Sequence, residues 1–353
     1  MSPQRVGIGF ALLSAALFGA STPIAKRLLA SVDPWVLAGI LYLGAGVGLA
    51  IVDRLRRLMR LPGVEAPLRR PDFPRLAIAI AFGGILAPVL LMFGLARSDA
   101  AGASLLLNVE GLATMAIAWI AFRENVDRRL VAGALAIVSG GVVLGWGGEV
   151  STQGGALLIV GACLCWGIDN NVTRGLAAAD PVRIATIKGL VAGTVNLALG
   201  LWSGAPMPDA DAIGATAAVG FLGYGVSLVL FVLGLRHLGT ARTAAYFSLA
   251  PFVGALVAIV LLGEPVTARL LLAGALMGAG LWLHLAERHD HEHAHDASDH
   301  EHRHRHDEHH RHDHGAEVPA GEAHSHRHRH APIVHRHSHY PDLHHRHRHG
   351  RTL

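Results

Sequence analysis

The sequence predicts an all-α membrane protein with ten transmembrane helices in two inverted five-helix repeats, followed by a disordered histidine-rich tail. Three observations predict this class: long apolar runs, arginines concentrated in alternate loops, and a weak internal repeat. The chain has 353 residues, of which 16% are charged, against roughly 25% in soluble domains. Its polar part is residues 287–353, which hold 23 of the 25 histidines.

The long apolar runs are the first observation, because a membrane helix needs about 20 mostly apolar residues. Ten such runs cover residues 6–29, 34–53, 74–97, 100–122, 129–147, 154–174, 182–202, 212–237, 241–262 and 268–286. The run from Leu76 to Ala96 carries no charge. Cys163 and Cys165 lie inside another run, which excludes a disulfide framework and favours simple packing over a soft-metal site. We therefore expect a multi-pass protein of a bacterial-type inner membrane, with the lipid bilayer as its surroundings.

Arginines in alternate loops set the expected orientation. They gather at 54–75, 123–129, 174–183 and 236–242, whereas the loops near 149 and 209–211 have none. The exceptions are Lys26, Arg27, Arg97 and Arg269. The positive-inside bias places both termini in the cytoplasm. Most of the membrane domain's arginines are thus topology signals, and no nucleic-acid partner is expected.

A weak repeat relates the two halves. A shift of 140 residues superposes Gly83 on Gly223, and Glu124-x-Val126 on Glu264-x-Val266. A shift of 148 superposes Phe18-Gly19 on Trp166-Gly167. Two repeats of five spans in series must be inverted relative to each other, as in many secondary transporters with a midplane solute site. We divide the chain into a first repeat (1–147), a second repeat (148–286) and the tail (287–353).

Segments in both halves of the chain resemble a known family. Residues 16–26 (ALFGASTPIAK) and 103–112 (ASLLLNVEGL), the second of which continues from residue 118 to residue 124, are similar to EamA-type carriers of the drug/metabolite transporter superfamily, and so is Leu249-Ala250-Pro251-Phe252 through Leu262-Gly263-Glu264-Pro265. The resemblance covers roughly residues 6–286 and implies ten helices, cytoplasmic termini and alternating access. The first copy has Asn125 where the second has Pro265, and the tail lies outside the family pattern.

Ionisable residues inside membrane helices are costly and usually face a cavity or a partner. Glu110 lies near the middle of its span, followed by Gly111, whose repeat mate is Pro251. It is a candidate carboxylate for a cationic group or a coupling proton, with packing as the alternative. Asp169 and Lys188 lie at similar depth and form a candidate ion pair, although Lys188 can also extend to the surface.

Further polar residues complete the predicted transport cavity. They are Asn108, Asn170, Asn171, Asn196, Tyr224, Ser227, Tyr246 and Ser248. Predicted helix breaks, typical of binding sites between repeats, are Pro23, Pro88, Gly111 and Pro251. Glu124 and Glu264 end their spans and are interpreted as structural.

The tail cannot form a core, because it lacks large apolar residues. Imidazole is a good ligand for Zn²⁺, Cu²⁺ and Ni²⁺, so the tail is a candidate site for Zn, Ni, Cu or Co. Its candidate ligands are His302, His304, His306, His324, His326, His328 and His330. The alternative is a low-complexity tail without a role in metal handling.

The predicted function is secondary transport of a small organic metabolite or drug-like solute by alternating access, in the export direction. The alternative is efflux of a divalent transition metal (Ni, Co or Zn) supplied by the tail. A third hypothesis is a non-transporting membrane protein whose tail stores metal. The sequence contains no catalytic triad, nucleotide-binding loop or H-E-x-x-H motif. We therefore expect no enzyme activity and no required cofactor, with a proton or cation gradient as the possible driving force.

Overall fold

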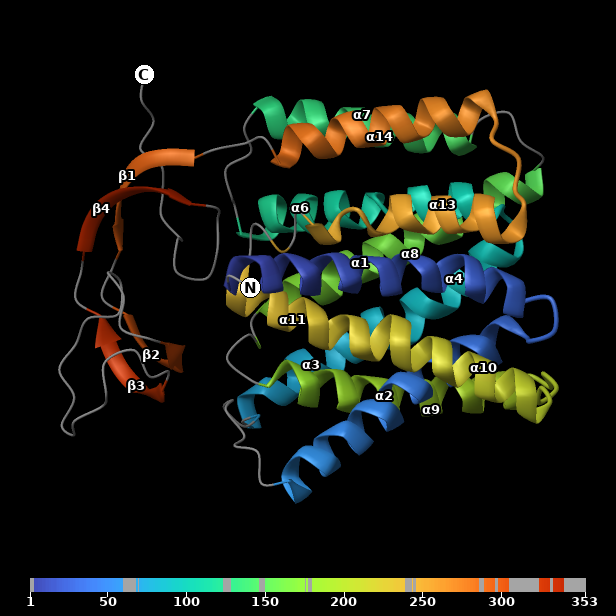
Figure 1. Ribbon diagram of the computed structural model, residues 1–353, viewed down its shortest axis with the longest axis horizontal. Coiled ribbons are helices and arrows are strands. Elements are labelled where there is room, and N and C mark those ends of the chain that lie inside the picture. The colour runs from blue at the N-terminus through green and yellow to red at the C-terminus, as the bar shows by residue number, and fades with distance from the viewer. Residues whose placement is uncertain are drawn as a thin grey trace.

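The helices form a bundle, and the structure describes most of the chain. The computed structural model describes residues 3–59, 68, 70–122, 128–145, 150–174, 176, 180–238, 243, 246–285, 289–295, 298–304, 324–330 and 333–339. Up to residue 285 the described elements are all helical. The all-helical part of the predicted fold class is therefore confirmed for the membrane domain, shown in Figure 1.

Among the described residues, eight helical stretches are long and apolar enough to cross a membrane. They are Arg5–Leu28, Pro34–Leu58, Arg70–Ala96, Ala100–Ala121, Arg128–Gly145, Gln153–Thr173, Val182–Trp202 and Ala210–Gly234. These match the first eight predicted spans. Two shorter apolar helices, α13 (Ala250–Leu262) and α14 (Ala268–Leu285), lie within the ninth and tenth. Residues 239–242, 244–245 and 286, which belong to these two predicted spans or their edges, lie outside the described residues, so ten spans stay a prediction.

Five spans are single helices and three are composite. The single helices are α1 (Pro3–Leu28), α2 (Pro34–Leu58), α7 (Arg128–Gly145), α8 (Val150–Arg174) and α9 (Pro181–Trp202). The third span joins η1 (Arg70–Asp72), α3 (Phe73–Ala79), η2 (Ile80–Leu86) and α4 (Ala87–Ala96). The fourth joins α5 (Ala100–Leu106) to α6 (Val109–Phe122), and the eighth joins α10 (Ala210–Gly220), η3 (Phe221–Val226) and α11 (Ser227–Leu238).

Two π-helical segments lie at matching positions in the two repeats. The segments η2 and η3 are both π-helical, and the shift of 140 residues superposes 81–86 on 221–226. Because π-helices are rare and often mark functional sites, their recurrence at matched positions is stronger evidence for the repeat than the sequence matches alone.

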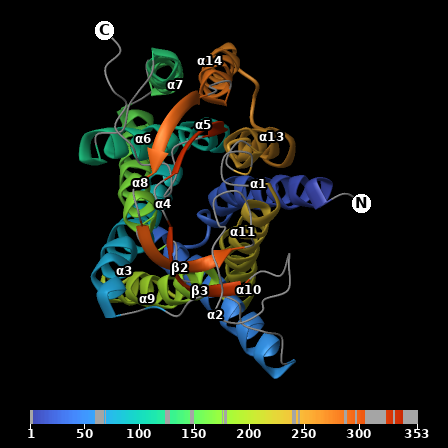
Figure 2. The same ribbon diagram turned by 90° about the vertical axis from the view of Figure 1, so that its left-hand side faces the viewer.

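Helix packing follows the same symmetry. Each of α2 and α7 packs against its own repeat mate, α9 and α14 respectively. The contact of α1 with α11 recurs as α8 with α4, and that of α1 with α13 recurs as α8 with α6. Figures 1 and 2 show α7 and α14 side by side at one edge of the bundle. Their close approach needs glycine, since a Cβ on Gly280 would lie 2.5 Å from the carbonyl oxygen of Gly133.

A carboxylate connects the end of α13 to the start of α5 at one end of the bundle. Both oxygens of Glu264, which follows α13, accept hydrogen bonds at 2.7 Å from the first two amides of α5, those of Ala100 and Ala101. Lys26 Nζ donates to the carbonyl oxygen of Leu95 at 2.6 Å nearby. Glu264 therefore satisfies amides that a helix start leaves without intrahelical partners, which agrees with its predicted structural role. Glu124 lies outside the described residues.

The predicted disorder of the tail stays a prediction, since only short stretches of the tail are described. Four strands are described there: β1 (His289–His295), β2 (Ser298–His304), β3 (His324–His330) and β4 (Ile333–His339). They form two separate antiparallel pairs, β1 with β4 and β2 with β3. Histidine at alternate positions matches the two-residue period of a strand, a pattern that composition alone does not reveal.

Candidate functional site

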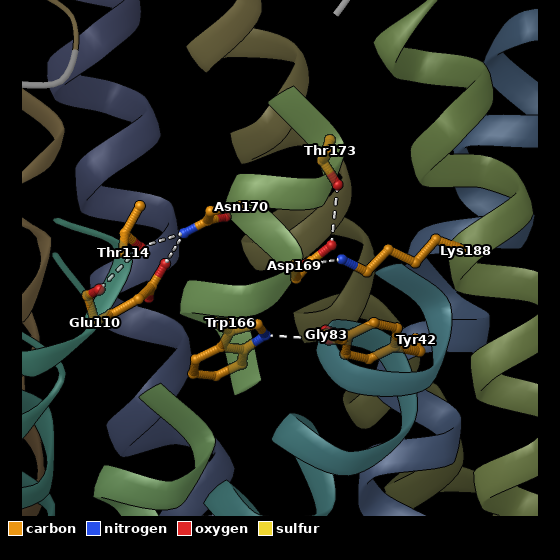
Figure 3. Close-up of polar contacts among 9 residues, drawn as sticks. All are labelled: Tyr42, Gly83, Glu110, Thr114, Trp166, Asp169, Asn170, Thr173 and Lys188. Atoms are coloured by element: carbon orange, nitrogen blue, oxygen red, sulfur yellow. Dashed lines mark hydrogen bonds and ion pairs between the residues drawn. The ribbon is translucent and has the colours of Figure 1, made fainter. Parts of the chain in front are cut away.

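The predicted pairing of Asp169 with Lys188 is present in the bundle. Asp169 Oδ2 on α8 forms an ion pair with Lys188 Nζ on α9. The Asp169 side chain is 6% exposed and that of Lys188 is 18% exposed. Thr173, one turn further along α8, donates a hydrogen bond at 3.0 Å to the second carboxylate oxygen. Figure 3 shows the carboxylate held between these two partners.

The π-helix η2 makes room for this carboxylate. A Cβ added to Gly83 would collide with the Asp169 side chain, so only glycine permits the approach. The carbonyl oxygen of Gly83 accepts hydrogen bonds from Tyr42 Oη at 2.8 Å and from Trp166 Nε1 at 3.1 Å. Side chains from two other spans therefore converge on one carbonyl group of the third span, where a π-helix departs from regular α-helical bonding.

Asn196 forms a hydrogen bond with the next carbonyl group of η2, that of Gly84. It is fully buried and donates from Nδ2 to the Gly84 oxygen at 3.1 Å. Its Oδ1 has no hydrogen-bond partner among the residues that the structure describes. The sequence predicts Asn196 as a cavity residue, and its described bond is to the backbone of η2. The sequence analysis did not select Tyr42 or Trp166. The only sequence feature that indicates this site is the pair of adjacent glycines at 83 and 84.

Glu110 forms a second polar cluster on α6. Asn170 of α8 donates from Nδ2 to Glu110 Oε1 at 3.0 Å and to Thr114 Oγ1 at 3.2 Å. Glu110 is half-buried and Asn170 is exposed. A Cβ at Gly111 would meet no atom within 4 Å. Because an ionisable group within a membrane span is costly against lipid, the bonds from Asn170 give this half-buried carboxylate a polar partner.

The two clusters are adjacent through α8. Asp169 and Asn170 are consecutive residues, one bonded to Lys188 on α9 and the other to Glu110 on α6. Figure 3 shows the two clusters on either side of the α8 backbone. The structure therefore brings carboxylates from two helices and one ammonium group into a single polar region of the bundle.

The helix breaks differ in part from the predicted positions. The fourth span is interrupted at Leu107 and Asn108, before Gly111, and the ninth at Ser248 and Leu249, before Pro251. Pro251 is instead in the first turn of α13, where its missing amide hydrogen costs nothing.

The two remaining prolines are also accommodated within helical structure. Pro88 likewise lies in the first turn of α4, which directly follows η2. Pro23 lies inside α1, which continues to Leu28 without a break.

Two predicted cavity residues are used in helix packing. Asn108 donates to the Leu105 carbonyl oxygen at 2.9 Å and approaches Met277 Sδ at 3.9 Å. Asn171 donates to the Thr114 and Gly167 carbonyl oxygens at 2.9 and 2.8 Å, which holds α8 against α6.

The other predicted residues lie in the second repeat and the tail. Ser227 Oγ donates to the Ser14 carbonyl oxygen at 3.1 Å and joins α11 to α1. Tyr224 on η3 packs its ring 5.6 Å from that of Tyr42. Tyr246 and Ser248 are half-buried before α13. Of the predicted metal ligands, His302 and His304 lie in β2, and His324, His326, His328 and His330 in β3. His306 lies outside the described residues.

Comparison with known proteins agrees with this architecture. Residues 5–146 and 153–286 each match the EamA-like transporter family. An uncharacterized transporter of Methanothermobacter thermautotrophicus is 27% identical over 284 residues, covering 75% of this chain and 82% of that protein. A protein of Streptantibioticus cattleyicolor named as a probable terminal-alkyne amino-acid exporter is 28% identical over 225 residues, covering 63% and 75%. One solved crystal structure has a TM-score of 0.57 at 20% identity, covering 80% of this chain and 96% of that one.

Proposed function

Because the chain belongs to the EamA-like transporter family, we propose that it exports a small organic solute with an amino group, by alternating access between the two repeats. The observation that carries the proposal is the Glu110–Asn170 pair. A half-buried carboxylate beside an exposed amide offers a negatively charged, partly hydrated binding position in the middle of a membrane domain.

The neighbouring ion pair extends the binding region. Lys188 provides a positive charge and Asp169 a negative one, so the polar region offers partners for both ends of a zwitterion. The Streptantibioticus relative's name, which refers to amino-acid export, supports the same solute class. Export is the direction expected from this relative and from the family resemblance.

A gradient is the proposed source of energy. A carboxylate that is bound by an ammonium group in one state and by a proton in the other would exchange the two across the membrane, provided that both bind at Glu110. The solute and the coupling proton would then compete for one site. Transport of the solute would depend on the proton gradient, and removal of the carboxylate would uncouple the two.

The test is transport by purified protein in liposomes. Glu110→Gln keeps the Asn170 contact possible but removes the charge, and uptake of a panel of labelled amino acids and amines should fall at least about tenfold, the effect of about 1.4 kcal/mol. Asp53→Asn is the matched control, because it makes the same change in an exposed pair with Arg57 far along α2. Wild-type rates in the Glu110→Gln variant would refute the proposal.

The same liposomes address metal efflux, the alternative function. Labelled Zn²⁺, Ni²⁺ and Co²⁺ are measured beside the amino solutes, with the full chain and with a chain truncated after residue 288. Robust metal flux through the truncated chain, without amino-solute flux, would make metal the cargo of the helices. Under our proposal, amino-solute flux is unchanged by the truncation.

A further inference from the structure

The C-terminal end of α2 projects from the bundle. Figures 1 and 2 both show the end of this helix leaving its neighbours. The last buried residue of α2 is Leu49. Four large apolar side chains beyond it are more than half exposed: Ile51 (55%), Leu55 (51%), Leu58 (66%) and Met59 (64%). Residues 51–59 therefore present apolar surface outside the packed core of the bundle.

The residues of this segment are sorted by polarity around the helix. The four exposed apolar residues recur at spacings of three and four, so they share one side, the apolar stripe. At 3.6 residues per turn, Arg54 and Arg56 flank the apolar stripe, one on each side. Asp53 and Arg57 lie opposite the stripe, where they form an ion pair at 2.5 Å. The segment is therefore amphipathic, with exposed arginines at both borders of its apolar side.

The length of α2 places this segment at the membrane surface. The helix has 25 residues and is therefore about 37 Å long, whereas the hydrocarbon core of a bilayer is about 30 Å thick. The sequence carries no charge from residue 34 to residue 52, and this part alone gives about 28 Å of helix. The uncharged part thus spans the hydrocarbon, and the charged residues that follow it reach the headgroup region.

An anionic phospholipid fits both parts of the segment. Amphipathic helices at a membrane surface bury their apolar side at the boundary of headgroups and acyl chains, with basic residues among the headgroups. Guanidinium groups bind phosphate through two parallel hydrogen bonds, and the long arginine stem lets the charge reach the headgroup level. A soluble anion would satisfy Arg54 and Arg56 but would leave the apolar stripe in water.

We propose that residues 51–59 form a binding surface for anionic phospholipids, with Arg54 and Arg56 on the headgroup phosphates and the apolar stripe among the acyl chains of the same leaflet. The proposal goes beyond the proposed function and does not depend on which solute is carried. The bound lipid would fix the end of the helix whose Tyr42 donates to the Gly83 carbonyl oxygen, so lipid composition would act on the helix that supports the polar region.

The test is a lipid titration of the full-length protein in neutral detergent micelles, with fluorescent short-chain phosphatidylglycerol and, separately, phosphatidylcholine carrying the same label. The wild type should bind phosphatidylglycerol at least about tenfold more tightly, because each basic residue near an anionic surface contributes about fivefold. The double variant Arg54→Gln/Arg56→Gln should lose this preference. The matched control is Arg129→Gln/Arg183→Gln, which removes two exposed arginines from the starts of α7 and α9 and should keep it.

A second variant separates the apolar contribution from the charge. Leu55→Ser/Leu58→Ser keeps the arginines, so it should weaken binding of both lipids by a similar factor and leave the preference in place. Raising NaCl from 0.05 to 0.5 M should weaken binding of phosphatidylglycerol and leave that of phosphatidylcholine unchanged.

Three results would overturn the proposal. The first is equal binding of the two lipids by the wild type. The second is an equal loss of preference in the two arginine variants, since binding would then follow the number of charges and not their place on α2. The third is displacement of phosphatidylglycerol by the same concentration of inorganic phosphate, which would indicate a phosphate site and not a lipid surface.

Discussion

Replacing Lys188 with glutamine should leave the Asp169 carboxylate buried without its cationic partner. Removing one member of a buried pair typically costs about 3–5 kcal/mol. Lys188 is 18% exposed and Thr173 still donates to Asp169, so we expect the lower end, about 3 kcal/mol. Asp169→Asn removes the other charge and should cost a similar amount. The double variant contains no unpaired charge, so part of the loss should return, with a coupling energy of about 2 kcal/mol.

The assay is reversible unfolding of the three variants in detergent micelles, with solute transport measured in parallel. The exposed pair of Asp53 and Arg57 on α2, whose side chains are 39% and 62% exposed, gives the control cycle. Its coupling should be at most about 0.5 kcal/mol, as for other i, i+4 pairs in water. If the losses for Asp169 and Lys188 add within about 0.5 kcal/mol, the energetic pairing is refuted even though the atoms are in contact.

Three further predictions concern the ends of the chain and of the bundle. A periplasm-dependent phosphatase fused at residue 290 should be inactive, and high activity would refute cytoplasmic termini. Glu264→Gln should lower the free energy of unfolding by about 1–2 kcal/mol, measured by thermal unfolding, because one charged acceptor for the α5 amides is lost, and an unchanged midpoint would contradict this. Metal binding by the tail should be lost between about pH 7.5 and 5.5, since histidine has a reference pKa of about 6.5 and protons compete for the ligand nitrogen. Metal titrations at the two pH values test this, and equal affinity at both would exclude histidine as the ligand.

The spans and the main ion pair follow from the sequence because each rests on a strong local cost. Charge in lipid is expensive, so Asp169 and Lys188 at equal depth on consecutive helices have few alternatives to each other. The same reasoning identified Glu110. Each of these predictions depends on the depth of a residue, which the apolar runs reveal directly.

The π-helices and the helix breaks were harder to predict. The Gly83 carbonyl group attracts Tyr42 and Trp166 only because η2 is π-helical, and no composition rule marks one extra residue in a helical turn. The fourth span breaks at Asn108 and not at Gly111, because glycine permits a break without requiring one. The tail's register depends on pairing between distant segments, which a single strand pattern does not contain.

The repeat is symmetric in its packing but not in its chemistry, and this asymmetry predicts solute preference. Gly83 lies against Asp169, and its repeat mate Gly223 lies against Ser21. The residue that faces the glycine is therefore charged when it comes from the second repeat and uncharged when it comes from the first. At the position related to Trp166, Phe18 packs its ring 5.7 Å from Tyr224 and 5.4 Å from Phe247. One side of the bundle interior is therefore charged and the other aromatic.

We expect amino solutes with large apolar side chains to compete for uptake more strongly than glycine or polyamines, because only they match both sides. Competition in the liposome assay measures this. Equal inhibition by glycine and phenylalanine in the wild type, or an unchanged ratio in Phe18→Ala, would show that the aromatic cluster is packing alone.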